Sequence, residues 1–81
     1  MASYVTVRVV GRDGRPKKGA RVGMWLHRSF LDSGFKRDNQ YTDGEGETEF
    51  VVDDARAVTI YVDGAEVAKE HPVESYIKVT V

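Results

Sequence analysis

The chain has 81 residues and a formal net charge of −1, with 41% hydrophobic and 31% charged residues. This balance predicts one small, soluble globular domain over residues 1–81 and is too apolar for a disordered tail. Because Cys is absent and no apolar run approaches the roughly 18–20 residues that cross a bilayer, we predict no disulfide, no thiolate metal site and no membrane insertion.

The N-terminal residues alternate between apolar and polar side chains from the start. Residues 3–10 contain neither a basic segment nor an apolar core of the kind that signal peptides carry. They therefore predict a first strand. The chain is expected to be cytoplasmic as given, unless it is a module excised from a longer secreted protein.

Apolar residues recur at every second position, the spacing of side chains that share one face of a strand. Val22, Met24 and Leu26 form one such row, which places Trp25 and His27 on the opposite face. The repeated pattern predicts seven strands, near residues 3–10, 20–28, 39–42, 47–52, 57–62, 65–69 and 75–81. Strands at this spacing indicate an all-β antiparallel sandwich or barrel.

Glycine-containing turns separate these runs. Residues 11–16 and 43–46 are predicted turns, and Asp63-Gly64 is a signal for a two-residue hairpin. Residues 27–41 lack strict alternation, and Gly34 breaks any helix there. This segment predicts a loop with one helical turn.

Three short motifs follow one another along the chain. They are Asp13-Gly14-Arg15-Pro16, Gly19-Ala20-Arg21-Val22, and Thr42-Asp43-Gly44-Glu45-Gly46 followed by Phe50. In this order they resemble the transthyretin-like superfamily, in particular the carboxypeptidase regulatory-like (prealbumin-like) domains, over nearly the whole chain. The resemblance implies a seven-stranded antiparallel Greek-key β-sandwich, transthyretin-like or immunoglobulin-like. All three motifs are architectural, and none supplies a catalytic group.

The sequence predicts no enzyme. Hydroxyisourate hydrolases of the same superfamily use a His/Arg/His constellation and end in Y-R-G-S. Here residues 76–81 read Tyr-Ile-Lys-Val-Thr-Val, and the histidines, His27 and His71, stand in unmatched contexts. The serines lack a nucleophile-elbow context. A hydrolase is therefore kept only as a third hypothesis.

The best candidate site is a surface formed by Trp25, His27, Phe30, Phe35 and Arg37. Outward aromatic side chains beside a cation are typical anchors of protein interfaces. In the alternative interpretation, the loop after the second strand folds over Trp25 and makes a small satellite cluster. Both interpretations stay open.

Two ligand classes are not predicted. The aromatic and basic residues of the segment 28–37 interleave as in nucleic-acid grooves, but they are few, and the acidic second half of the chain would oppose a polyanion. Asp43, Glu45, Glu47 and Glu49 lack the spacing of a calcium loop. We therefore expect no nucleic acid, no metal and no cofactor.

Two functional hypotheses remain. The leading one is a non-catalytic interaction or structural module that binds a protein partner, or a second copy of itself, through an exposed sheet face or edge. The alternative is a small-ligand or carbohydrate-binding domain that uses Trp25 and residues 29–41. A pocket lined by Trp25 and converging polar groups would favour the ligand-binding domain, and a flat aromatic face would favour the interaction module.

Overall fold

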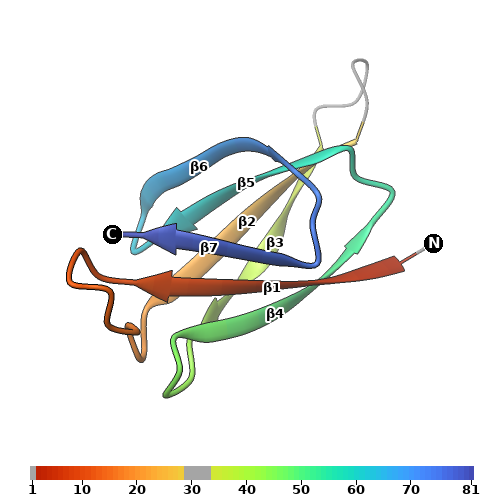
Figure 1. The fold of residues 1–81 in the computed structure, drawn as a ribbon. Coiled ribbons are helices and arrows are strands. Elements are labelled where there is room, and N and C mark those ends of the chain that lie inside the picture. The colour runs from red at the N-terminus through yellow and green to blue at the C-terminus, as the bar shows by residue number, and fades with distance from the viewer. Residues whose placement is uncertain (1, 29–33) are drawn as a thin grey trace.

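The computed structural model describes residues 2–28 and 34–81, and its strands form two facing sheets (Figure 1). The strands are β1 (Ala2–Val10), β2 (Arg21–His27), β3 (Phe35–Tyr41), β4 (Glu47–Asp53), β5 (Ala57–Val62), β6 (Ala65–Pro72) and β7 (Tyr76–Thr80). One sheet has the order β4-β1-β7 and the other the order β3-β2-β5-β6. The predicted all-β chain with two sheets is confirmed. In the described ranges no helix is long and apolar enough to cross a membrane.

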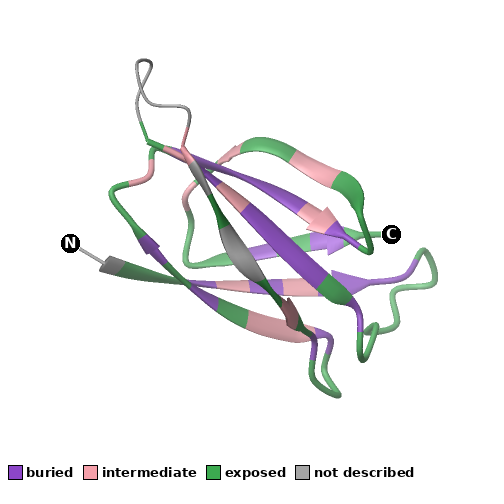
Figure 2. Cartoon of the chain, turned by 180° about the vertical axis from the view of Figure 1, so that it is seen from behind, coloured by how far each residue is buried: buried purple, intermediate pink, exposed green. Residues whose placement is uncertain are grey.

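The core lies between the sheets and is built from alternating residues of both. Its largest fully buried side chains are Phe50, Met24, Leu26 and Ile60, and valines of β1, β2, β4, β5 and β7 complete it together with Ile77 and Ala20. Figure 2 shows the buried stretches along the strands and mainly exposed turns. The predicted inward row of β2 is confirmed, because its members are 0% exposed. Removal of these side chains from water is the main favourable term in folding.

The pairing of β1 corrects the prediction of a wholly antiparallel fold. β1 is antiparallel to β4 but parallel to β7, with Thr6 opposite Tyr76 and Val10 opposite Thr80. Side chains alternate with a period of two in both kinds of ladder. The hydrophobic pattern that predicts β7 therefore carries no information about its direction.

The expected loop over residues 27–41 is wrong for residues 35–38, because β3 begins at Phe35 and not near residue 39. β3 is an edge strand that pairs only with β2 in its sheet. Its described side chains are Lys36, Asn39 and Tyr41, which are exposed, and Gln40, which is half-buried. A strand held mainly by backbone hydrogen bonds to one neighbour needs no row of apolar side chains, so its sequence shows no alternation.

The turn between β5 and β6 has the predicted two-residue form. Asp63 and Gly64 have φ values of 50° and 86°, the positive values that hairpin turns of the I′ type require at both central positions. The backbone N–H of Asp63 donates to the Arg21 carbonyl at 2.8 Å. In return, the Arg21 N–H donates to Asp63 Oδ1 at 3.1 Å. The hairpin therefore fixes the first residue of β2.

The glycine-containing motifs meet at one end of the molecule. The Thr42 hydroxyl accepts the Ala20 N–H at 2.9 Å and donates to the Lys17 carbonyl. Gly46 has a φ of 76° and accepts the Val9 N–H at 2.7 Å through its carbonyl. These bonds tie the segments before β2 and β4 to β1, so the motifs act in the architecture of the fold.

Candidate functional site

A groove of about 260 Å³ lies on the outer face of the four-stranded sheet. Its lining comes from three adjacent strands, β3, β2 and β5, and from the β5–β6 turn. The lining residues are Arg21, Gly23, Trp25, Lys36, Asn39, Tyr61 and Gly64. We call this surface the Gly23 groove.

The floor of the groove is Gly23, which is buried although it is on the outer face of β2. A Cβ atom at this position would lie 2.8 Å from Asn39 Oδ1 and 3.9 Å from Lys36 Cε. These two side chains therefore reach from the edge strand β3 over β2. Because Gly23 has no side chain, it leaves space for the Asn39 and Lys36 side chains and for the groove.

Two aromatic side chains flank this floor. Tyr61 on β5 is directly opposite Gly23, while Trp25 is opposite Thr59. Trp25 and Tyr61 are therefore diagonal neighbours, a relation that separates residues on adjacent strands by about 7–8 Å. Both are half-buried. Gly34 lies against the Trp25 indole, since a Cβ at Gly34 would be 2.9 Å from Trp25 Nε1, so the chain itself covers one edge of the ring.

The ends of the groove carry positive charge. Lys36 is directly opposite Trp25 in the β2–β3 ladder. Arg21 starts β2, where the hairpin holds its backbone, and its Nη2 lies 3.5 Å from the position that a Cβ at Gly64 would take. Both side chains are exposed. The groove thus combines two aromatic faces, one amide and two cations.

Of the two predicted candidate residues whose side chains the structure describes, Trp25 lines the groove and His27 does not. Phe30 lies outside the described residues. Phe35 and Arg37 belong to β3, where they are paired with Leu26 and Met24. Neither of them is therefore opposite Trp25, and their side chains are outside the described part. The cation opposite Trp25 is accordingly Lys36, the residue between them.

The predicted candidate residues include none of the other described residues that line the groove. Arg21 and Trp25 share one face of β2, which the alternation already implied. Lys36, Asn39 and Tyr61 reach the groove only because β3 and β5 flank β2. The lateral order of strands is not encoded in the period of any one of them.

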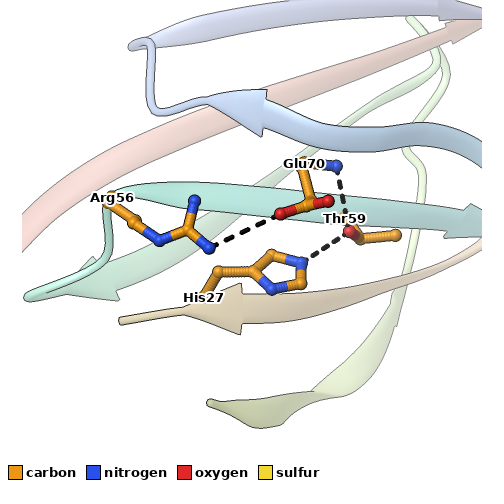
Figure 3. A network of polar contacts seen from close by, with 4 residues as sticks. All are labelled: His27, Arg56, Thr59 and Glu70. Atoms are coloured by element: carbon orange, nitrogen blue, oxygen red, sulfur yellow. Dashed lines mark hydrogen bonds and ion pairs between the residues drawn. The ribbon is translucent and has the colours of Figure 1, made fainter. Parts of the chain in front are cut away.

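His27 is not one of the described lining residues; it lies at the end of β2 in a polar network around Thr59, which is opposite Trp25 (Figure 3). The His27 Nε2 is 2.7 Å from the Thr59 hydroxyl, which also accepts the backbone N–H of Glu70 at 3.1 Å. The Glu70 carboxylate lies 3.5 Å from Arg56 Nη2. Glu70 has a φ of 45° at a bulge in β6, which turns its N–H toward Thr59. His27 therefore helps to secure this bulge.

The outer face of the three-stranded sheet is different. Tyr4, Val51 and Tyr76 are 63%, 40% and 46% exposed, and Tyr4 pairs with Val51 across β1 and β4. Nearby, a hydrogen bond to Tyr76 and the negative charge of Glu47 raise the pKa of the Arg8 guanidinium above its ordinary value, although desolvation acts in the opposite direction. This face carries three large exposed side chains, Tyr4, Val51 and Tyr76, among charged residues such as Arg8, Glu47 and Glu49.

In the acidic turn before β4, the Asp43 carboxylate accepts hydrogen bonds from the backbone. Asp43 Oδ1 accepts the N–H groups of Glu45 and Glu47 at 2.9 and 3.0 Å. Within residues 2–28 and 34–81 no group of three or more His, Asp or Glu side chains is arranged to hold a metal ion.

Comparisons of the chain with models of known protein families and with curated proteins found no match.

Proposed function

We propose that this chain is a non-catalytic binding domain that holds a small ligand in the Gly23 groove. The observation that carries the proposal is the convergence of Trp25, Tyr61, Lys36 and Asn39 on a glycine floor. Ligand sites are concave and combine apolar or aromatic walls with a few placed polar groups. The groove has these properties, whereas a surface that only packs against another protein needs no hollow.

The proposal includes membership of the transthyretin-like superfamily and a Greek-key topology. It is supported by the position of the three motifs that resemble that superfamily. Thr42 from one motif binds Ala20 from another, and Gly46 binds β1. The motifs are far apart in the sequence but join the same end of the two sheets, as architectural motifs would.

A non-catalytic role is supported by the groups in the groove and by the state of His27. The lining offers aromatic rings, an amide and cations, which bind and orient a ligand. The imidazole of His27 is engaged with the buried Thr59 hydroxyl, and His27 is not among the described residues that line the groove.

The test is an amide NMR titration of the ¹⁵N-labelled chain with a set of small sugars and aromatic acids. We expect shifts confined to β2, β3, β5 and the β5–β6 turn, and we expect Trp25→Ala to abolish them. Tyr4→Ala, which removes an exposed ring from the opposite sheet, is the matched control and should bind as the parent does. Shifts confined to β1, β4 and β7 would contradict the proposal.

A second candidate function is association with a protein partner or with another copy of the chain. It is favoured by the exposed Tyr4, Val51 and Tyr76 on the three-stranded sheet, because exposed aromatic side chains are common in interfaces. Size-exclusion chromatography with light scattering tests self-association. A dimer that Tyr4→Ser dissociates while Trp25→Ala does not would support this function, and a monomer at millimolar concentration would exclude self-association.

A further inference from the structure

The charge of the Gly23 groove restricts the ligands that it accepts. Among the residues whose side chains the structure describes, the lining contains two cations, Arg21 and Lys36, and no carboxylate. Neither cation forms an ion pair with a carboxylate of the described residues. The acidic residues closest along the ladders are Asp38 of β3, whose side chain is outside the described part, Asp63, which accepts the Arg21 N–H, and Glu66, which is opposite Tyr61 on β6. Among the described residues, the charged side chains of the lining are both cations, so a negative ligand would meet positive charge there.

The Lys36 side chain reaches the floor of the groove beside the Asn39 amide. Lys36 Cε lies 3.9 Å from the position that a Cβ at Gly23 would take, and Asn39 Oδ1 lies 2.8 Å from the same point. Asn39 Oδ1 faces the floor as an acceptor, so the charge and the N–H donors for a carboxylate come from the Lys36 ammonium. Hydrogen bonds between a cation and a carboxylate are about twice as strong as those between neutral groups. The Lys36 ammonium can therefore bind one carboxylate.

The size and walls of the groove favour a ring. Its volume of about 260 Å³ is slightly below the range of about 300–1,000 Å³ that is usual for small-molecule sites. The rings of Trp25 and Tyr61 border the floor, and such rings pack well against flat or cyclic apolar faces. The strand below, β2, is paired on both sides, so it offers no free edge for pairing with an extended peptide. A single ring is the better occupant.

We propose that the Gly23 groove binds a carboxylate carried on a six-membered ring. The carboxylate lies at Lys36, and the ring lies between Trp25 and Tyr61. This inference rests on the proposed function, because it names the ligand class of the same groove. Two sources supply this chemistry: a uronic acid residue of an acidic saccharide, and an aromatic carboxylate.

The experiment uses two matched pairs of probes on the ¹⁵N-labelled chain. Trigalacturonic acid is compared with galactotriose, and benzoate with benzyl alcohol, so that each pair differs chiefly in the carboxylate. We expect the charged member to shift the groove amides and to bind at least about tenfold more tightly than its neutral partner, because only it meets the cations. The tighter of the two charged probes identifies the source.

Charge-removing variants locate the effect within the groove. Lys36→Gln should weaken binding of the charged probe by about tenfold, and Arg21→Gln by less, because Arg21 is at the far end of the groove. Lys78→Gln removes an exposed cation from β7 of the other sheet and should leave binding unchanged. An increase in salt should weaken binding of the parent, as screening requires. The amide spectrum of each variant reports whether it is folded.

The possible failures are distinct. If galactotriose or benzyl alcohol shifts the groove amides as strongly as its charged partner, the carboxylate inference is wrong while the proposed function stands. Weakening by Lys78→Gln equal to that by Lys36→Gln would show a general charge effect and would also overturn the inference. If none of the four probes shifts the groove amides, both the inference and the proposed function fail.

Discussion

Replacement of Phe50 by Ala tests the two-sheet core most directly. Phe50 is the largest fully buried side chain, and it is on β4 opposite Val5 of β1. Loss of a buried Phe side chain costs about 3–5 kcal/mol in transferred surface and residual cavity. A domain of this length is stable by about 4–12 kcal/mol, at about 0.05–0.15 kcal/mol per residue. Phe50→Ala should therefore remove between a quarter and all of the free energy of unfolding.

The measurement is urea and thermal unfolding followed by the fluorescence of Trp25, the single tryptophan. At about 4–8 °C for each kcal/mol in a domain of this size, the midpoint should fall by about 12–40 °C. Phe50→Leu keeps more of the volume and should cost about 1–2 kcal/mol. Val51→Ala, at the next position and 40% exposed, should change stability by less than about 0.5 kcal/mol. A Phe50→Ala protein that melts within a few degrees of the parent would refute this account of the core.

Two further predictions concern the Thr59 hydroxyl and the backbone at Gly46. Thr59→Val should cost about 1–3 kcal/mol, because it removes the partner of two part-buried hydrogen-bonding groups, His27 Nε2 and the Glu70 N–H, whereas Thr59→Ser should be milder. Urea unfolding compares the two variants, and equal costs would show that the hydroxyl is unimportant. Gly46→Ala should prevent folding or destabilise strongly, because its Cβ would lie 2.5 Å from the Val9 carbonyl oxygen at a φ of 76°. Gly44→Ala, where nothing lies within 4 Å, should melt near the parent temperature, and a loss there equal to that of Gly46→Ala would contradict this steric argument.

The sequence predicts the parts of this fold that follow from local periodicity. The alternation of Val22, Met24 and Leu26 identifies the buried face of β2, and Asp63-Gly64 identifies a hairpin. The strand conformation of residues 35–38 is not predicted from the sequence, because an edge strand needs no row of apolar side chains. The direction of β7 escapes it because parallel and antiparallel strands have the same side-chain period.

The candidate site is less accessible to such reasoning. Trp25 could be placed on the outer face of β2 from the sequence alone. Lys36 and Tyr61 could not be placed beside it, because that requires the register of β2 with β3 and with β5. A bulge in β2–β3 pairing between Val22 and Met24 shifts that register further. A site assembled across several strands depends on their order in the sheet, which is a property of the whole chain.

The parallel pairing of β1 with β7 has a mechanical consequence. A force that pulls residue 1 and residue 81 apart acts along the two strands in opposite directions, because they run side by side with the same orientation. The hydrogen bonds of their ladder, which runs from the Thr6–Tyr76 pair to the Val10–Thr80 pair, are then loaded together in shear and must break nearly at once. An antiparallel pair held at one open end would instead unzip one bond at a time. Stretched in tandem between neighbouring domains, this chain would resist extension through its first and last strands, so the two sheets would stay closed until that ladder ruptured.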